Sequence, residues 1–188
     1  MIRKLRKGYL EFKATKLNDL KDIFKKFEDG QSPHTLFITC SDSRIDPNLI
    51  TCSLPGDLFI IRNAGNYVAL GDIDKEHACV ASTMEFALNV LKIKNVVICG
   101  HTDCGAVKSA ATDLSQTTYL KSYIPNFKID CCTSLNECIE ENVRKQIQKL
   151  KADKTFANDI KIEGWVYDVV TGGLKVLEQD GNHFLPVE

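Results

Sequence analysis

Apolar residues follow two kinds of pattern along the chain. Short β-rich runs bounded by turn residues predict buried strands over residues 35–39, 58–61 and 95–99. Longer segments with apolar side chains at helical spacing predict helices over residues 16–27, 74–92, 104–111 and 133–150. The second of these helices is so rich in apolar residues that we expect it to be largely buried. A terminal hairpin is expected from residues 165–170 and 174–177, around a turn at residues 171–173.

Strands separated by helices predict an α/β fold, in which a mainly parallel β-sheet is flanked by helices. The terminal hairpin would add an antiparallel C-terminal edge strand. Because no repeat, linker or low-complexity stretch interrupts the pattern, we expect a single domain over residues 1–188, with an N-terminal helical arm over about 1–30. Ligands of such sheets bind beyond the carboxyl ends of strands. Cys40 and His101 stand at two of these ends, where chemistry is therefore expected.

The composition narrows the choice of partners and compartment. The chain is 44% hydrophobic and 26% charged, with a formal net charge of -1. A charge so close to zero gives no general attraction to nucleic acid or anionic lipid. No stretch reaches the roughly 20 apolar residues of a membrane helix, and the basic N-terminus lacks the apolar run of a secretory signal. We therefore expect a cytoplasmic protein with no nucleic acid and no membrane partner.

Eight cysteines are many for 188 residues, and they first suggest a disulfide framework. Without an export signal, a reducing compartment is expected instead, and cysteines there serve metal or redox chemistry more often. Several are expected to be inert core residues, because a free thiol packs like a small hydrophobic group.

Cys40, His101 and Cys104 form a candidate set of zinc ligands. Catalytic zinc usually has three protein ligands and an open fourth position. The H-x-x-C spacing lets a His at a strand end and a Cys at a helix start reach one ion. Gly100 and Gly105 flank this pair and are expected to permit a tight backbone turn. The alternative is that both cysteines are buried thiols and the histidine is an ordinary hydrogen-bonded residue, but the three together favour a metal.

Asp42 and Arg44 extend this pattern. Two residues past Cys40 along an extended backbone, Asp42 is expected to project to the same side as the cysteine. Arg44 can hold that carboxylate with a planar fork of donors. A carboxylate beside a metal site can orient a reacting water, and the arginine would keep it ionised. The alternative is a turn-forming aspartate in a surface ion pair.

These residues resemble the signature of β-class carbonic anhydrases. That signature is Cys-Ser-Asp-Ser-Arg, here from Cys40, followed about sixty residues later by His-x-x-Cys-Gly, here from His101. Three further segments, beginning at Pro55, Met84 and Gly164, are also similar to segments of that family. The resemblance therefore covers most of the chain after its N-terminal arm, with several motifs in the same order.

The resemblance implies a site, an activity and an assembly. One Zn²⁺ per chain would be held by Cys40, His101 and Cys104, with Asp42 and Arg44 as catalytic residues. The activity would be the reversible hydration of carbon dioxide to bicarbonate and a proton. Enzymes of this family are dimers or larger, so we expect a homodimer or homotetramer with active sites at the dimer interface.

Two kinds of β-class enzyme differ around this site. The regulated kind has a Trp and a Gly shortly before the zinc cysteine, which help to bind an inhibitory bicarbonate, and this chain has Phe37 and Thr39 there. Arg62 does match the arginine of that pocket. The plant-like kind carries Gly-Gln-Ser-Pro ahead of the first motif, as this chain does from Gly30. The resemblance thus implies the plant-like, open-site kind, in which Asp42 stays off the zinc.

In the plant-like kind, a glutamine and two aromatic residues line the carbon dioxide pocket. The matching residues are Gln31, Phe59 and Phe86, although Phe86 stands where the plant enzymes have a tyrosine. The resemblance suggests that a neighbouring chain supplies Gln31 or the aromatic residues. The alternative is that both phenylalanines are ordinary core and Gln31 an ordinary loop residue.

Two other functions remain open on the sequence. The same scaffold can hydrolyse a related heteroallene, carbon disulfide or carbonyl sulfide, and the shape of the pocket would decide between these substrates. Further cysteines, Cys131, Cys132 and Cys138 among them, suggest a non-enzymatic zinc or thiol sensor. The pairing of Asp42 with Arg44 argues against a pure sensor, because metal storage has no use for it.

Overall fold

The structure is a computed structural model that describes residues 1–69, 78–110, 116–127, 133–156 and 159–188. The chain divides into two compact units, Met1–Ser32 and Pro33–Glu188. The expected helix start at 74–77, together with Cys131 and Cys132, lies outside the described residues. Among the residues described, no helix has both the length and the apolar character to cross a membrane.

The N-terminal unit is a string of short helices. They are α1 (Ile2–Ala14), α2 (Lys16–Asp19), α3 (Lys21–Lys25) and the 3-10 turn η1 (Lys26–Asp29). None of these helices buries a side chain. The prediction of one continuous helix over 16–27 is wrong, because the backbone leaves the helical region at Leu20. Short helices are marginal without tertiary packing, so nothing within this unit enforces a longer one.

The second unit is built on a six-stranded sheet with the order β2-β1-β3-β4-β5-β6. The strands are β1 (Thr35–Cys40), β2 (Leu58–Asn63), β3 (Asn95–His101), β4 (Lys161–Tyr167), β5 (Leu174–Leu177) and β6 (Phe184–Pro186). The first four pair in parallel, whereas β5 and β6 are antiparallel. This arrangement confirms the predicted α/β fold, with β6 as an additional strand. The predicted hairpin strand β4 also extends further toward the N-terminus, where it pairs with β3.

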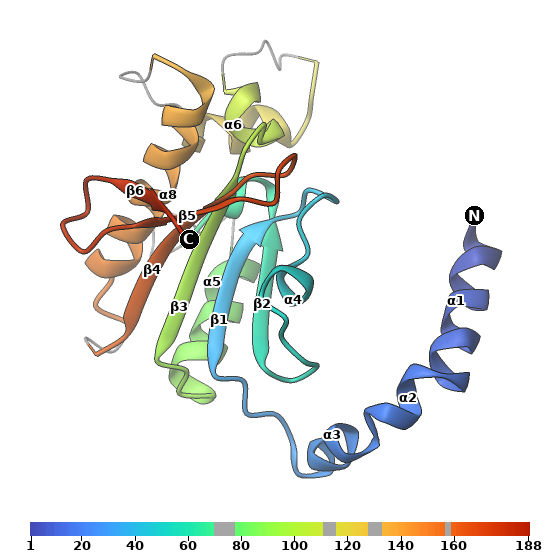
Figure 1. Ribbon diagram of the computed structural model, residues 1–188. Helices are drawn as coiled ribbons and strands as arrows, with labels where there is room; N and C mark the ends of the chain where they lie inside the picture. Colours follow the sequence, from blue (N-terminus) through green and yellow to red (C-terminus); the bar gives the residue numbers. More distant parts are fainter. Residues whose placement is uncertain (70–77, 111–115, 128–132, 157–158) are drawn as a thin grey trace. The chain divides into compact units, whose positions relative to one another are not determined.

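Helices of the second unit pack on the sheet mainly from one side (Figure 1). They are α4 (Pro47–Ile50), α5 (Ala78–Glu85), α6 (Gly105–Ser109), α7 (Leu120–Tyr123) and α8 (Leu135–Ala152), with shorter turns at η2 (Ala64–Asn66), η4 (Phe86–Val90) and η5 (Ile124–Phe127). Helices α5 and α8 and the π-helical turn η4 share one core with the sheet. The prediction of a largely buried helix is wrong, because α5 buries only Met84. The sheet covers one side of this helix, and Phe86 just beyond it is 42% exposed.

Two glycines let α8 lie close against the sheet. A Cβ on Gly100 would come within 2.8 Å of Val143 Cγ2, and one on Gly164 within 2.7 Å of Ile147 Cδ1. Both distances are too short for real side chains, so the helix sits where only glycine leaves room. The result is a tightly packed back wall behind the strands that carry the candidate ligands.

The other face of the sheet carries a smaller apolar cluster around Phe37, Ile45, Val97 and Cys99. Trp165 packs on it with its ring edge-on to Phe37 at a centroid distance of 5.7 Å. A cleft of about 560 Å³ opens on this face, lined in part by Phe37 and Trp165. This face is therefore less fully covered than the one under α5 and α8.

Candidate metal centre

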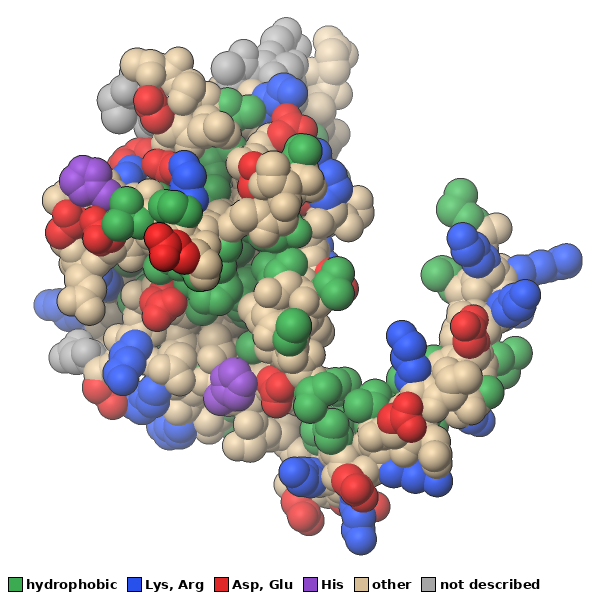
Figure 2. All heavy atoms as spheres, viewed as in Figure 1, with side chains coloured by type: hydrophobic (Ala, Val, Ile, Leu, Met, Phe, Trp, Pro, Cys, Tyr) green, Lys and Arg blue, Asp and Glu red, His purple; other side chains and the backbone are tan. Residues whose placement is uncertain are grey.

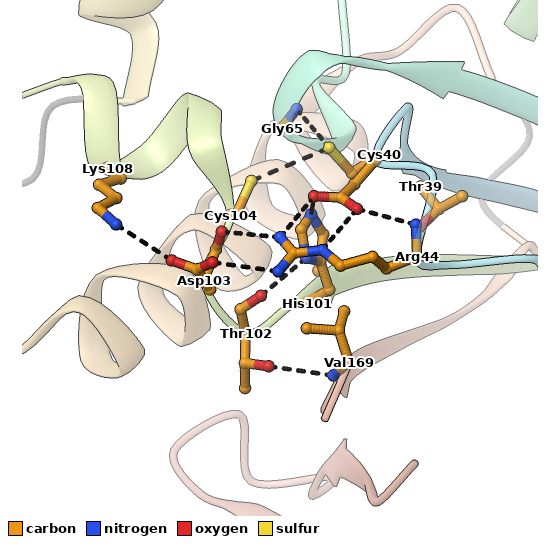
Figure 3. A network of polar contacts seen from close by, with 12 residues as sticks. Thr39, Cys40, Arg44, Gly65, His101, Thr102, Asp103, Cys104, Lys108 and Val169 are labelled. Atoms are coloured by element: carbon orange, nitrogen blue, oxygen red, sulfur yellow. Dashed lines mark hydrogen bonds and ion pairs between the residues drawn. The ribbon is translucent and has the colours of Figure 1, made fainter. Parts of the chain in front are cut away.

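The carboxyl ends of β1 and β3 bring the three candidate ligands together (Figure 3). Cys40 is the last residue of β1 and His101 the last of the adjacent strand β3, while Cys104 precedes the first turn of α6. All three are buried, and their ligand atoms lie within 4.8 Å of one another. The two sulfurs are 4.0 Å apart. The sequence pattern thus does correspond to a compact group of metal-ligating atoms.

His101 presents one bare nitrogen to this group. Its Nδ1 is 2.9 Å from the carbonyl oxygen of Thr102, to which it donates, so the proton sits on Nδ1. Nε2 is then a lone-pair acceptor, and it is fully buried without a hydrogen-bond partner. Burial disfavours the charged form of His101, but Cys40, the Thr102 carbonyl and Asp42 together outweigh burial and raise the pKa of His101. A buried nitrogen of this kind is what a metal ion would satisfy.

Cys40 is prepared to be a thiolate. A hydrogen bond from the Cys104 thiol lowers the pKa of Cys40 to about 4, and burial opposes this shift only in part. The backbone N–H of Gly65 also donates to the Cys40 sulfur, at 3.4 Å. The pKa of Cys104 is raised, because its proton is held between the two sulfurs. A cation between the sulfurs would replace that shared proton.

These residues fit a zinc ion. Two thiolates and an imidazole are a common catalytic zinc set. Two sulfurs bound to one tetrahedral zinc at about 2.3 Å each would lie roughly 3.8 Å apart, close to the observed 4.0 Å. The orphaned Nε2 of His101 supplies the third ligand atom. The donor set thus leaves one position of a tetrahedral ion for a small reactant.

The turn between His101 and Cys104 is made differently from the prediction. Neither Gly100 nor Gly105 has a positive φ, so the expectation that these glycines permit the turn is wrong. Asp103 takes the left-handed conformation instead, with φ 55°. Aspartate tolerates this region better than most residues. Gly100 is needed for a different reason, its close approach to α8.

Asp42 and Arg44 form a close ion pair at the edge of the ligand group. Arg44 donates from Nε to Oδ1 at 2.9 Å and from Nη2 to Oδ2 at 2.7 Å of Asp42. These hydrogen bonds hold the pKa of Asp42 well below its usual range. The Oδ2 atom of Asp42 also lies 3.9 Å from Nε2 of His101. An ionised carboxylate thus lies beside the ligand group.

Arg62 uses its guanidinium on the main chain. Its Nε donates to the carbonyl of Cys40 at 3.1 Å, and its Nη2 donates to the carbonyl of Asp42 at 2.7 Å. Nearby, the Thr39 hydroxyl donates to the carbonyl of Cys99, and Phe37 is 1% exposed. Phe37, Thr39 and Arg62 match the positions of the inhibitory bicarbonate pocket. Phe37 and Thr39 are buried, and Arg62 is bonded to the backbone.

Two of the candidate pocket residues, Phe59 and Phe86, lie away from the metal group of their own chain. Phe59 pairs with Leu36 in the sheet register, whereas Cys40 pairs with Asn63. Four residues of β2 separate the two levels, which is roughly 13 Å at about 3.3 Å per residue. Phe86 lies with Phe59, their ring centroids 6.1 Å apart. Gln31 belongs to the N-terminal unit and is exposed.

Two residues at the site were missed in the sequence. Gly65 donates to Cys40 with φ 74°, and a Cβ there would meet Phe127 at 2.6 Å. The signal available was an Asn-Ala-Gly-Asn stretch directly after a strand, which favours a left-handed turn. Asp103 accepts two hydrogen bonds from Arg44. Its position between two candidate ligands was the only hint of a role.

Known proteins resemble this chain over nearly its whole length. Residues 35–174 match the sequence pattern of the family described as carbonic anhydrase. The carbonic anhydrase of Helicobacter pylori strain J99 is 32% identical, with 96% of this chain and 92% of the relative covered. That of Synechococcus elongatus is 34% identical, with 91% and 70% covered.

Solved structures agree with this match. The β-carbonic anhydrase CcaA superimposes with a TM-score of 0.85 at 29% identity, covering 100% of this chain and 92% of that one. A tetrameric β-carbonic anhydrase of Sordaria macrospora gives 0.81 at 26% identity, covering 94% and 96%. The family match and the shared fold coincide with a buried Cys-His-Cys group at the same strand ends that the signature predicts. The chain therefore belongs to the carbonic anhydrase family and is an enzyme of its β class.

Proposed function

We propose that this chain catalyses the reversible hydration of carbon dioxide to bicarbonate and a proton, with one Zn²⁺ per chain on Cys40, His101 and Cys104. The observation that carries this proposal is the buried ligand group itself. Its histidine has an unsatisfied Nε2, its cysteines share one proton, and an ionised carboxylate faces it. Thiolate ligands suit a reducing compartment, and we place the protein in the cytoplasm on that ground.

The chain's own residues divide the work of this reaction. Zinc, when bound, supplies a Lewis acid that lowers the pKa of a bound water toward about 7. Asp42 is placed to accept a hydrogen bond from the attacking water. This bond would orient the water so that a lone pair of the water oxygen points at the substrate. Arg44 keeps that carboxylate ionised, because a depressed pKa leaves Asp42 charged at all pH values above the acidic range. Asp42 therefore orients the water without keeping its proton, which must pass to solvent.

The carbon dioxide pocket is proposed to be completed by a second copy of the chain. Carbon dioxide is apolar and suits aromatic walls with one amide donor, here Phe59, Phe86 and Gln31. Because β2 places Phe59 roughly 13 Å from the level of Cys40, and Phe86 lies beside Phe59, these two rings serve the site of a neighbour better than their own. The 42% exposure of Phe86 leaves its ring free to do so.

The N-terminal unit supports the proposed self-association. Its helices bury nothing, and Leu5, Tyr9 and Leu10 are 60% or more exposed, as the apolar patches among the lysines in Figure 2 illustrate. Nine Lys and Arg against five Asp and Glu give Met1–Ser32 a net charge of +4, which leaves -5 for the rest of the chain. A basic, apolar arm complements an acidic body, so we propose a homodimer or homotetramer in which arms pack on neighbouring copies.

We further propose that the enzyme is of the plant-like, open-site kind. Phe37 is buried against Trp165, whose Nε1 donates to Glu163. The Thr39 hydroxyl and the Arg62 guanidinium are bonded to main-chain carbonyls. These residues therefore offer little to an inhibitory bicarbonate. Without such a ligand, Asp42 gains nothing by leaving Arg44 for the metal.

A hydration assay with a metal count tests the main proposal. The wild-type chain should contain one zinc and hydrate carbon dioxide, and Cys104→Ala should lose both. Cys79→Ala, which changes an exposed thiol, is the matched control and should keep both. If the chain turned over carbon disulfide or carbonyl sulfide and not carbon dioxide, the proposed substrate would be wrong. Full zinc occupancy in Cys104→Ala would contradict the ligand assignment.

A further inference from the structure

Arg44 connects the two loops that carry the candidate metal ligands. Besides its bonds to Asp42, it donates from Nη1 to Oδ2 of Asp103 at 3.1 Å and from Nη2 to the Asp103 carbonyl at 3.3 Å (Figure 3). Asp42 follows Cys40 on the loop after β1, whereas Asp103 lies between His101 and Cys104. One guanidinium thus holds acceptors from both loops.

This connection lies just past the end of the direct pairing between β1 and β3. The register between β1 and β3 ends with Thr39 opposite Cys99. Cys40 and the loop from His101 to Cys104 therefore extend past the last residue pair of these two strands. Each loop is still bonded to its outer neighbouring strand, Ser41 to Asn63 and Thr102 to Tyr167. Direct contact between the two loops is made by side chains, and the pairing of Arg44 with Asp103 is one charged contact of this kind.

The backbone of Asp103 is shaped for this contact. Its left-handed conformation, φ 55°, turns both its carbonyl and its carboxylate toward Arg44. Lys108 binds the other carboxylate oxygen, Oδ1, at 3.3 Å, which leaves Oδ2 to Arg44. A charge-assisted pair of this kind is stronger and more directional than a neutral hydrogen bond. A residue that made only a turn would not need the second, side-chain contact.

We propose that Asp103 is a positioning residue for the metal site: through Arg44 it holds the Cys40 loop and the His101–Cys104 loop at the spacing that one zinc ion requires. This inference rests on the proposed function, because it takes these three residues as the zinc ligands. Asp103 is not one of the three candidate ligands. It acts on zinc affinity by reducing the freedom of the two loops before the ion binds.

The test is zinc affinity, measured by competition with a chelator. Asp103→Gly removes the side chain and keeps the left-handed backbone without strain. Its zinc dissociation constant should rise roughly tenfold, at the lower end of the range for residues that orient metal ligands. Asp103→Asn keeps the size and loses the charge, so it should show a smaller rise. Asp159→Asn, which breaks an exposed ion pair with Lys94, is the control and should bind zinc like the wild type.

A double-mutant cycle separates positioning from a general role in the turn. If Asp103 acts through Arg44, then adding Asp103→Gly to Arg44→Ala should change the zinc dissociation constant by less than about twofold. An equal tenfold loss in both backgrounds would overturn the inference, as would wild-type affinity in both Asp103 variants. A wild-type chain that binds no zinc would overturn the proposed function as well, so the two failures are distinguishable.

Discussion

At the carboxyl ends of β1 and β3, Cys40, His101 and Cys104 are buried and bonded to groups of the same chain. Near the amino end of β2, Phe59 and Phe86 contact each other at the surface, and Phe86 is 42% exposed. One end of the sheet is thus nearly complete within a single chain, and the other is not. This difference supports our proposal that the residues that activate water belong to one chain, while the walls around carbon dioxide are shared between copies.

The largest loss of activity is expected from a change beside the candidate metal group. Asp42→Asn keeps the shape of the side chain but removes the charge that Arg44 holds and that faces the ligand group. Carbon dioxide hydration should fall roughly 10–100-fold with zinc retained, as is typical when a group that orients a metal site is lost. Stopped-flow hydration with metal analysis measures both. An unchanged rate in a zinc-loaded variant would reduce Asp42 to a turn residue.

A smaller loss of activity is expected from a change in the proposed carbon dioxide pocket. Phe86→Ala removes one apolar wall of the proposed pocket, and kcat/KM should fall roughly tenfold, as for other changes in hydrophobic pockets. Zinc content should stay at one per chain. Phe59 lies far from the ligands along β2, and Phe86 packs beside Phe59.

Mixing chains then tests the sharing directly. In a mixed dimer of Cys104→Ala and Phe86→Ala chains, one of the two sites has an intact metal group and an intact pocket. Random pairing makes half of the dimers mixed, so co-expressed chains should show about a quarter of wild-type activity or more. A mixture no more active than the average of the two variants would mean that each site of a mixed dimer carries one lesion, and the pocket would then come from the same chain as the metal group.

The smallest effect is expected from added bicarbonate. With Arg62 bonded to the carbonyls of Cys40 and Asp42, no second bicarbonate should shift Asp42 onto the metal. Activity should decline only as ordinary product inhibition predicts, with a Hill coefficient near 1. A steep, cooperative loss of activity would show that the site can close after all.

Most of the candidate metal group could be predicted from the sequence, because parallel strands bring their carboxyl ends together. A Cys after one β-rich run and a His at the end of another were therefore expected to meet, and they do. The turn between His101 and Cys104 was predicted wrongly. The flanking glycines were expected to permit it, whereas Asp103 adopts the left-handed conformation. Glycine has two uses in this fold, a left-handed turn and a close helix approach, and the sequence alone does not distinguish them.

The incomplete end was harder to predict for a different reason. The high content of apolar residues predicted that the segment of α5 and η4 is largely buried, but composition does not show what covers a helix. Phe86 is apolar and exposed within one chain, so only the resemblance to a family suggested a use for it. The breaks in the N-terminal helices have a similar origin, since their conformation is not fixed by packing within the unit that contains them.

The close approach of α8 to the sheet also acts on the candidate metal group. Asn142 of α8 donates to the carbonyl of Gly65, and Gln146 accepts from the backbone of Val68. The turn that donates to Cys40 is therefore fixed by a helix on the back of the sheet, which in turn requires Gly100 and Gly164. Ligand geometry is then in part a product of core packing, and a change in α8 can alter the metal group from the opposite side of the sheet.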